Sequence, residues 1–186
     1  MGKNFESECV GMRILSGTFK NRTLSSPKGG KTRPTSSKMR ASVFNILQGL
    51  VEGADFLDVF AGSGAMGLEA LSRGAASATF IERDAQAARC IRQNLKTLGI
   101  NGKILQRDAS LALKQLDKKY DIIYIDPPYD LEITPLLKLL PSLIKDGGSI
   151  LVEQSSRVEL DVSPLTLENK RTYGDSVLYF LSAELS

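Results

Sequence analysis

Histidine is absent from the 186-residue sequence, and cysteine occurs only twice. Without histidine the chain lacks the commonest general base and the commonest metal ligand, so any catalysis must rely on carboxylates, tyrosine or the alignment of substrates. Cys9 and Cys90 are far apart and have no paired spacing, which argues against a disulfide framework and against a zinc site. We therefore expect no bound metal.

Long apolar runs are also missing. No stretch of the sequence has the apolar length of a membrane span, and the N-terminus lacks the charged, apolar and small-residue order of a signal peptide. We expect a cytoplasmic protein with no membrane association. With 42% apolar and 24% charged residues, the chain can bury one sizeable core, which predicts one main domain with a short appendage.

Basic residues are concentrated at the start of the chain. Residues 1–40 hold nine Lys and Arg against two acidic residues, a net charge of +7, whereas residues 41–186 hold fifteen basic and nineteen acidic residues, a net charge of −4. This asymmetry favours a polyanionic partner, although a solvated lysine-rich loop has the same composition. We predict a basic N-terminal arm over residues 1–34 and a main domain over residues 35–186. The candidate nucleic-acid contacts in the arm are Arg13, Lys20, Arg22, Lys28 and Lys31.

The arm and its junction with the main domain have recognisable local patterns. The segment from Arg13 to Pro27 holds two short β-prone runs around Lys20-Asn21-Arg22, which predicts a hairpin with basic side chains. Apolar residues at helical spacing then run from Met39 to Leu50. This spacing predicts an amphipathic helix, with Thr35, Ser36 or Ser37 as the candidate N-cap.

From Asp55 onward, strand-like apolar runs alternate with helical segments. The runs are FLDVF, ATFIE, KILQ, DIIYID and GSILVE, and the helical segments lie near residues 65–73, 85–98, 109–116 and 131–145. This alternation predicts right-handed βαβ units, and so an α/β fold with a parallel sheet covered by helices on both faces. Two β-prone runs around Tyr173-Gly174-Asp175 predict a C-terminal hairpin that closes the sheet.

The residues that follow the first strand form a glycine-rich segment. Ligands of doubly wound sheets bind beyond the carboxyl ends of the strands, so these positions are candidates for a binding site. In DVFAGSGAMG, the residues Gly62, Gly64 and Gly67 match G-x-G-x-x-G, a pattern that lets backbone amides approach a ligand at a helix N-terminus. A tight turn alone would also account for these glycines.

Acidic residues follow the next three strands. Glu82 ends the second strand, where an acid can bind both hydroxyls of a ribose. Asp108 follows the third strand and can accept a bond from an adenine amino group, and the fourth strand ends in Asp126-Pro127-Pro128-Tyr129. Taken singly, Glu82 and Asp108 could cap helices and the prolines could merely end a strand. Their joint occurrence at successive strand ends favours a nucleotide site.

Asp58 distinguishes between two kinds of nucleotide. This acid ends the first strand, four residues before Gly62. A dinucleotide would place its pyrophosphate at the helix N-terminus, where a nearby negative charge is unfavourable. The amino group and sulfonium of S-adenosylmethionine suit an acid at that position better. A nicotinamide cofactor remains the alternative.

Several of these segments together resemble one known family. DVFAGSGAMGLEALSRGA, the acid of FIERD, RDA, DPPY and the leader KTRPTSSKMRASVFNIL are similar to the bacterial 16S rRNA guanine-N2 methyltransferases often called RsmD. The similarity runs from Met12 to near the C-terminus and includes Tyr173-Gly174. It implies a Rossmann-like class I S-adenosylmethionine-dependent methyltransferase domain with a mostly parallel seven-stranded sheet. It also implies an N-terminal extension that helps to hold ribosomal RNA.

The resemblance implies a role for each matching residue. Asp58, Ala61, Gly62, Ser63, Gly64 and Gly67 would surround the methionine part of the cofactor, Glu82 would hold its ribose, and Asp108 with Ala109 its adenine. The leader residues Arg33, Pro34, Thr35 and Arg40 would lie beside the site, and Arg33, Thr35 and Arg40 are added to the candidate RNA contacts. The expected product is S-adenosylhomocysteine, the expected partner is 16S rRNA or the small ribosomal subunit, and we expect a monomer.

The leader departs from the family pattern at three positions. Ser37-Lys38 stands where the family usually has Asp-Arg, and Ala41 where it usually has Glu. The loss of two acids makes the arm more basic and leaves the matching Arg40 in place. Residues 1–11 precede the usual start of the family.

The chemistry of amine methylation explains the residue types in the turn Asp126-Pro127-Pro128-Tyr129. An exocyclic amine on guanine is a poor nucleophile, because its lone pair is delocalised into the ring. Asp126 and the carbonyl of Pro127 can accept its N–H bonds and so direct the lone pair at the methyl group, while Tyr129 can stack on the base. DNA adenine-N6 methyltransferases use a similar turn, so they are the first alternative. A nicotinamide oxidoreductase and a noncatalytic RNA-binding module are the more distant ones.

Overall fold

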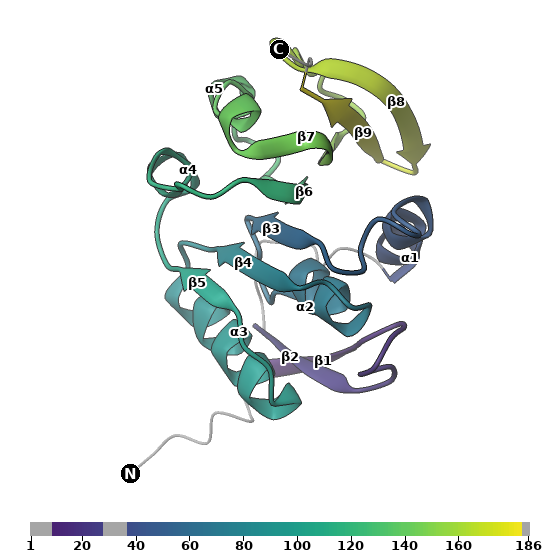
Figure 1. Ribbon diagram of the computed structural model, residues 1–186, viewed down its shortest axis with the longest axis vertical. Coiled ribbons are helices and arrows are strands. Elements are labelled where there is room, and N and C mark those ends of the chain that lie inside the picture. Colours follow the sequence, from purple (N-terminus) through teal and green to yellow (C-terminus); the bar gives the residue numbers. More distant parts are fainter. Residues whose placement is uncertain (1–8, 28–36, 184–186) are drawn as a thin grey trace.

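A seven-stranded sheet forms the centre of the protein (Figure 1), and a computed structural model describes residues 9–27 and 37–183. The strand order is β5-β4-β3-β6-β7-β9-β8. The first five strands in this order are mutually parallel, and β9 runs antiparallel to both of its neighbours, which confirms the mostly parallel sheet. The bounds are β3 Asp55–Val59, β4 Ser77–Ile81, β5 Lys103–Leu105, β6 Tyr120–Ile125, β7 Ile144–Ser155, β8 Thr166–Tyr173 and β9 Ser176–Ser182.

Helices cover both faces of this sheet, as expected for parallel strands whose two faces are apolar. Successive side chains of a strand point to opposite faces. In β3, Leu57 and Val59 pack with α4 (Ala109–Lys114) and α5 (Thr134–Leu137), whereas Phe56 packs with α1 (Ser37–Ile46) and α2 (Ala65–Ser72). Figure 1 shows α4 and α5 on one side of the sheet and α1 and α2 on the other. The last long helix, α3, spans Ala85–Leu98.

An N-terminal hairpin is present, but its first strand lies before the segment Arg13–Pro27 that the sequence suggested, apart from Arg13 itself. Strands β1 (Cys9–Arg13) and β2 (Thr23–Pro27) pair antiparallel, from Cys9 opposite Pro27 to Arg13 opposite Thr23. Ile14 and Leu24 are each 1% exposed and belong to the same apolar cluster as Ile91 of α3. The hairpin is therefore packed onto the main domain through a shared core, and Figure 1 shows it beside α2 and α3.

One helix is much shorter than the sequence suggested. The segment 131–145 contains only α5 and a 3-10 turn at Leu140–Ser142, and β7 already begins at Ile144. Pro135 and Pro141 explain the interruption, because proline has no N–H to continue a helix and is tolerated only in its first turn. The C-terminal hairpin is confirmed, with Gly174 at a φ of 60° in the turn between β8 and β9.

Some sequence predictions lie outside the described residues. These are the N-cap candidates Thr35 and Ser36 and the candidate contacts Lys28, Lys31, Arg33 and Thr35. In residues 9–27 and 37–183, no helix has the length and apolar character needed to cross a membrane.

Candidate active site

The ends of β3 and β6, which carry Asp58 and Asp126, meet where the strand order of the sheet reverses. Strands β3 and β6 are parallel neighbours, with Asp58 opposite Tyr124 and Val59 opposite Ile125. The chain leaves β3 towards α2 on one face and leaves β6 towards α5 on the other, and such switch points are where doubly wound sheets bind ligands. The amide of Asp126 donates to the carbonyl of Val59 at 3.4 Å. The acidic turn and the glycine loop are thus directly joined.

The glycine loop has an unusual backbone over several residues. Gly62 and Gly64 have φ values of 55° and 81°, in the left-handed region that glycine tolerates best. A Cβ placed on Gly62 would meet no atom within 4 Å, so the backbone there is open to a ligand. Phe60 also has a positive φ, 62°, and it was not predicted as a site residue. A non-glycine residue in this region marks local strain of the kind that clusters at binding sites.

Gly67 lies inside the protein rather than at the loop surface. A Cβ on Gly67 would lie 2.3 Å from the Phe80 ring, so only glycine allows α2 to pack this closely on β4. Its amide donates to Oδ2 of Asp58 at 2.9 Å. The third glycine of the motif therefore serves helix–strand packing and holds Asp58 in place, which is the packing role known for this position.

Asp58 is almost fully buried, at 2% exposure. Burial raises the pKa of Asp58 well above its ordinary value; the bond from Gly67 lowers it in part, and the nearby charges of Asp126 and Glu82 raise it further. Asp126 and Glu82, from two other strand ends, therefore lie close enough to Asp58 to influence it. Such a group of acids suits a ligand with positive charge.

Glu82 connects the loops that follow β3 and β4. Its Oε2 accepts a bond from the Gly62 amide at 2.8 Å, and its Oε1 accepts one from the Asp84 amide at 2.7 Å. It does not cap the following helix, because Asp84 accepts from Ala87 and is the N-cap of α3. Each carboxylate oxygen can accept a second bond, so Glu82 retains acceptor capacity for ribose hydroxyls.

Asp108 has the capping geometry that its sequence position also allowed. Its Oδ1 accepts bonds from the amides of Ser110 and Leu111, at 2.9 and 3.4 Å, and so caps α4. The side chain is exposed, while Ala109 is buried. Both capping bonds use Oδ1, so Oδ2 is not needed for the cap. The adenine contact of Asp108 and Ala109 remains a prediction.

The turn after β6 presents an aromatic ring to solvent. Asp126 is half-buried, Pro127 is buried, and Tyr129 is 52% exposed, one of the few large apolar side chains on the surface. The amide of Leu131 donates to the carbonyl of Pro128 at 3.0 Å, which closes the turn. The ring of Tyr129 is therefore free to take up a flat partner such as a base.

Tyr124 and Glu153 lie near this turn, and neither was identified from the sequence as a candidate site residue. The hydroxyl of Tyr124 donates to Oε2 of Glu153 at 2.8 Å. Burial raises the pKa of the Tyr124 hydroxyl well above its usual range, and the charges of Asp126 and Glu153 raise it further. Glu153 comes one residue after Val152, the partner of Ile125, so it lies beside the start of the turn. Its position after the apolar run GSILV is the same signal that identified Glu82 after ATFI.

The candidate RNA contacts divide into three groups. Arg13, Lys20 and Arg22 are exposed on the hairpin, and the residues between 28 and 35 lie outside the described part of the chain. Arg40 is only 1% exposed and donates to the carbonyl of Arg13 at 2.7 Å. Burial lowers the pKa of Arg40, and the charge of Glu69 partly offsets this shift. Its burial argues against direct contact with RNA and for an anchoring role between hairpin and main domain.

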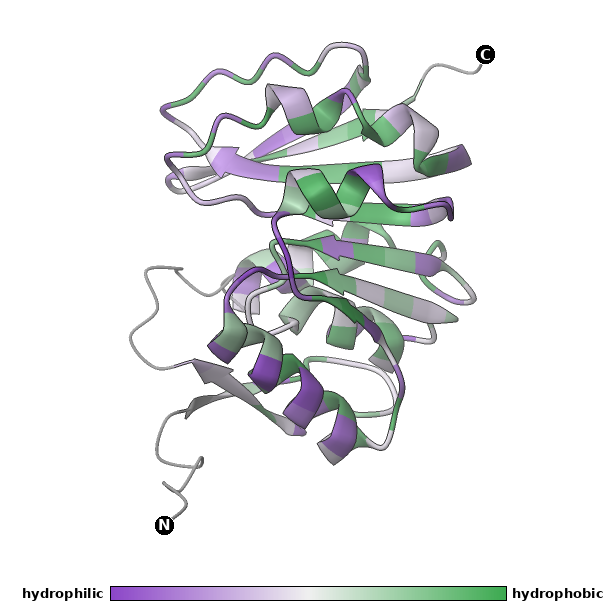
Figure 2. Cartoon of the chain, turned by 90° about the vertical axis from the view of Figure 1, so that its left-hand side faces the viewer, coloured by the Kyte–Doolittle hydropathy of each residue, from purple (hydrophilic) through white to green (hydrophobic). Residues whose placement is uncertain are grey.

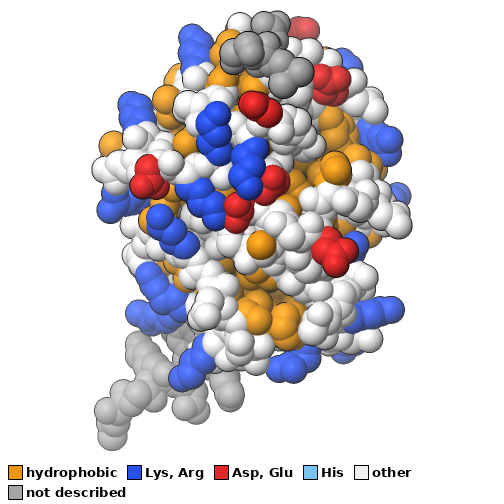
Figure 3. Space-filling view, in the orientation of Figure 1, with side chains coloured by type: hydrophobic (Ala, Val, Ile, Leu, Met, Phe, Trp, Pro, Cys, Tyr) orange, Lys and Arg blue, Asp and Glu red, His pale blue; other side chains and the backbone are white. Residues whose placement is uncertain are grey.

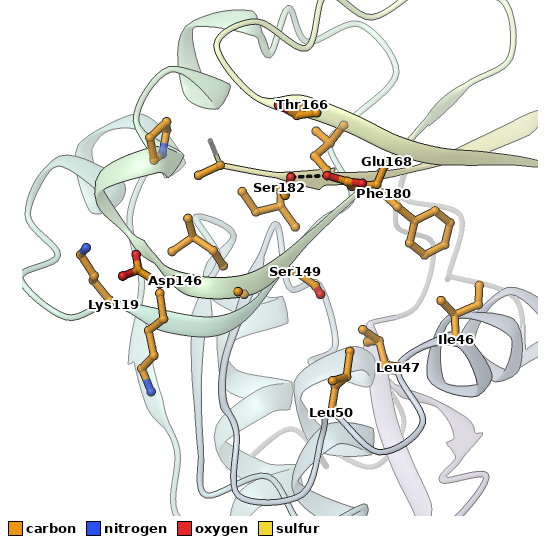
Figure 4. A pocket seen from close by; sticks show the side chains of 18 residues that line it. Ile46, Leu47, Leu50, Lys119, Asp146, Ser149, Thr166, Glu168, Phe180 and Ser182 are labelled. Atoms are coloured by element: carbon orange, nitrogen blue, oxygen red, sulfur yellow. Dashed lines mark hydrogen bonds between the residues drawn. The ribbon is translucent and has the colours of Figure 1, made fainter. Parts of the chain in front are cut away.

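A cavity of about 580 Å³ lies elsewhere, between α1, β7, β8 and β9. Figure 4 shows Leu47, Leu50 and Phe180 around this space, together with Glu168 and its partner Ser182. None of the predicted site residues lines it. Among the described residues, no group of three or more Cys, Asp or Glu could hold a metal ion.

Comparison with known proteins agrees with this arrangement. The model of a family described as Conserved hypothetical protein 95 matches residues 12–182. The chain belongs to this family. Its relatives include YlbH of Bacillus subtilis, 38% identical over 173 residues that cover 88% of this chain and 94% of YlbH. Ribosomal RNA small subunit methyltransferase D of Escherichia coli is 38% identical over 152 residues, which cover 81% of this chain and 75% of that protein.

Solved structures of similar chains establish the fold class. The Escherichia coli protein yhhF is 32% identical and superposes with a TM-score of 0.84, covering 95% of this chain and all of that one. A Thermus thermophilus 16S rRNA N2 G1207 methyltransferase, solved with AdoMet and guanosine, is 17% identical with a TM-score of 0.71, covering 95% of this chain and 50% of that one. This Conserved hypothetical protein 95 member therefore has a Rossmann-like class I methyltransferase fold.

Proposed function

We propose that the protein transfers a methyl group from S-adenosylmethionine to the exocyclic N2 amine of a guanine in 16S rRNA, within the small ribosomal subunit or its precursors. The observation that carries the proposal is the junction of two loops, in which the Asp126 amide bonds to Val59 beside the glycine loop. This junction lies between the turn that we assign to the amine and the loop that we assign to the cofactor. Relatives named as methyltransferases of small-subunit ribosomal RNA support the choice of substrate.

The residues present fit the proposed cofactor. The open side of Gly62 leaves room for a ligand against the backbone, and Glu82 keeps acceptor capacity for two ribose hydroxyls. Asp58 offers a buried carboxylate, which a positively charged ligand would stabilise in its ionised form. S-adenosylmethionine supplies a methyl group that its positive sulfur makes electrophilic. A pyrophosphate would meet three carboxylates instead, which disfavours the nicotinamide alternative.

The protein's part in the reaction is to hold and align the amine. Asp126 and the carbonyl of Pro127 accept the two N–H bonds, and Tyr129 stacks on the base that carries the amine. A nitrogen–carbon bond forms as the carbon–sulfur bond breaks, and the bonding electrons remain on sulfur in S-adenosylhomocysteine. The amine gives up one proton, and we assign Asp126 as its acceptor.

The experiment combines labelled methyl donor with 16S rRNA, with assembled small subunits and with double-stranded DNA, followed by nucleoside analysis. We expect label in N2-methylguanosine from the RNA or the subunits, and none with an Asp126→Ala control. Label in N6-methyladenine from DNA would overturn the assignment in favour of the first alternative. Titration with S-adenosylmethionine and with NAD separates a methyltransferase from an oxidoreductase, and binding of RNA without any transfer would indicate a noncatalytic module.

A further inference from the structure

The outward face of α3 carries a stripe of positive charge. Arg89, Arg92 and Lys96 are exposed and lie three and four residues apart, so they follow one another along one face of the helix. The opposite face, with Ile91 and Leu95, is buried in the core. Figure 2 shows hydrophilic residues repeating along the outer side of α3, the lowest helix in that view.

Neighbouring segments are also basic. Residues 9–27 of the hairpin and residues 85–107 around α3 together contain eight Lys and Arg and no Asp or Glu, although the whole chain has 24 basic and 21 acidic residues. All eight are exposed. In the lower part of Figure 3, where α3 and the hairpin lie, Lys and Arg side chains occur and no acidic one is seen among the described residues on that face. The eight are Arg13, Lys20, Arg22, Arg89, Arg92, Lys96, Lys103 and Arg107.

Hydrogen bonds hold the hairpin and α3 in a fixed relation. Arg22 donates to the carbonyl of Thr97 at 3.1 Å, and Asn94, which is 2% exposed, exchanges two bonds with the backbone of Ser25, at 2.7 and 2.9 Å. The side chain of Asn94 also donates to the carbonyl of Ser63 in the glycine loop at 3.2 Å. Asn94 therefore connects the hairpin, α3 and the glycine loop.

We propose that this α3–hairpin surface, formed by the eight basic residues, binds backbone phosphates of the ribosomal RNA substrate. The inference rests on the proposed function and extends the RNA contact from the N-terminal arm to the main domain. The uncharged exposed residues of α3 include Gln86, Gln93 and Thr97, and none of the large apolar side chains exposed in the described residues lies on α3 or the hairpin. Cations without an exposed large apolar side chain on α3 or the hairpin fit a phosphate backbone better than a protein interface or a membrane.

The test measures RNA affinity against salt for three variants. The first is Arg89→Gln/Arg92→Gln/Lys96→Gln. The second removes the same charge elsewhere, through Lys138→Gln/Arg157→Gln/Lys170→Gln, three exposed positions outside the surface. The third, Arg89→Lys/Arg92→Lys, retains the charge. Binding of a 16S rRNA transcript is followed by filter binding between low and moderate salt, and S-adenosylmethionine affinity and thermal unfolding confirm that each variant is folded.

Each phosphate contact contributes about 0.7 to 0.9 to the slope of log affinity against log salt concentration. We expect the first variant to flatten the slope by about 2 to 3 and to bind RNA at least tenfold more weakly at moderate salt, while the other two keep the parental slope. An unchanged slope in the first variant would refute the surface. An acidic polypeptide serves as a second probe. If the first variant loses binding to this polypeptide but keeps its RNA binding, the surface belongs to a protein partner and the proposal is refuted.

The outcomes separate this inference from the proposed function. If the parent methylates guanine in rRNA while the first variant keeps the parental salt slope, the α3–hairpin surface is wrong and the activity stands. If the first variant loses RNA affinity while the parent methylates only DNA, the surface stands as a phosphate-binding site and the substrate assignment is wrong.

Discussion

Arg40 of α1 and Glu69 of α2 form a buried ion pair. Both side chains are 1% exposed, and Nε of Arg40 lies 3.8 Å from Oε2 of Glu69. The same carboxylate accepts bonds from the amides of Leu15 and Ser16, at 2.8 and 3.0 Å, and from Arg73 at 2.8 Å. One acid thus ties α1, α2 and the segment between β1 and β2 together.

Replacing this acid should destabilise the fold. Glu69→Gln keeps the shape of the side chain but leaves the buried charge of Arg40 without its counterion. We expect the free energy of unfolding to fall by about 3 kcal/mol, as is typical when one partner of a buried pair is removed. Urea denaturation would measure this change. Glu159→Gln, at an exposed position, serves as the control, and an equal small effect of both substitutions would show that the pair contributes nothing.

Loss of Glu82 should weaken cofactor binding. Glu82→Ala removes the proposed ribose contact and also frees the Gly62 amide. We expect S-adenosylmethionine affinity to drop by about 1.5–3 kcal/mol, the usual contribution of a hydrogen bond to a charged group. Isothermal calorimetry checks this, with Glu52→Ala at an exposed position as the control. Equal affinity in the parent and in Glu82→Ala would sink the ribose assignment.

Asp58 should make cofactor binding depend on pH. Burial raises the pKa of Asp58 above its ordinary value of 3.8. The protonated acid therefore stabilises the free folded protein. This stabilisation is fully present below pH 3.8 and is lost as the pH rises through the raised pKa. A positively charged ligand favours the ionised carboxylate. Affinity for S-adenosylmethionine should therefore increase with pH across this interval, and binding should release protons.

Calorimetry in two buffers with different ionisation enthalpies would detect the released protons. Asp58→Asn cannot ionise and should show neither the release nor the pH dependence. Identical proton release by the parent and by Asp58→Asn would contradict the assignment of this group.

Asp126→Asn should separate catalysis from cofactor binding. The variant keeps the shape of the side chain, but its amide group can face the substrate amine as a donor and carries no charge. Cofactor affinity should change little, because the proposed ribose and adenine contacts come from other strand ends. The single-turnover methylation rate at saturating cofactor should fall at least a hundredfold, in the range seen when a group that acts in the transition state is removed. Methylation of guanine at the parental rate would reduce the turn to a strand terminator.

Tyr129→Ala should act mainly on capture of the base. The ring is 52% exposed, so its removal leaves no cavity in the buried core. Loss of stacking should weaken the free energy of RNA binding by about 1–3 kcal/mol, and so raise the apparent Kd, with a smaller loss of rate. Tyr129→Phe preserves the ring and should behave like the parent. If both variants bind RNA equally well, the base does not stack at this position.

The sequence alone determined the elements and the positions at which the chemistry gathers. Apolar runs and helical periods are local patterns, so they located strands β3 to β6 and helices α2, α3 and α4 within a few residues. The segment 131–145 was the exception, because it holds only the short α5 and β7 begins at Ile144. The carboxyl ends of parallel strands share one edge of a sheet, so Asp58, Glu82, Asp108 and Asp126 could be assigned to one site before any coordinates were known.

Only the tertiary structure decided what the surroundings of each charge would be. Arg40 has the leader pattern of a surface contact, yet it is buried because Glu69, 29 positions later in the sequence, supplies its counterion. Gly67 belongs to the glycine motif, yet the Phe80 ring fixes it as a packing residue. The helical spacing of Arg89, Arg92 and Lys96 can be read from the sequence, but only the packing of the hairpin against α3 brings Arg22 beside them. Burial and charge clusters depend on segments distant in the chain, and no local pattern encodes which of these segments will meet.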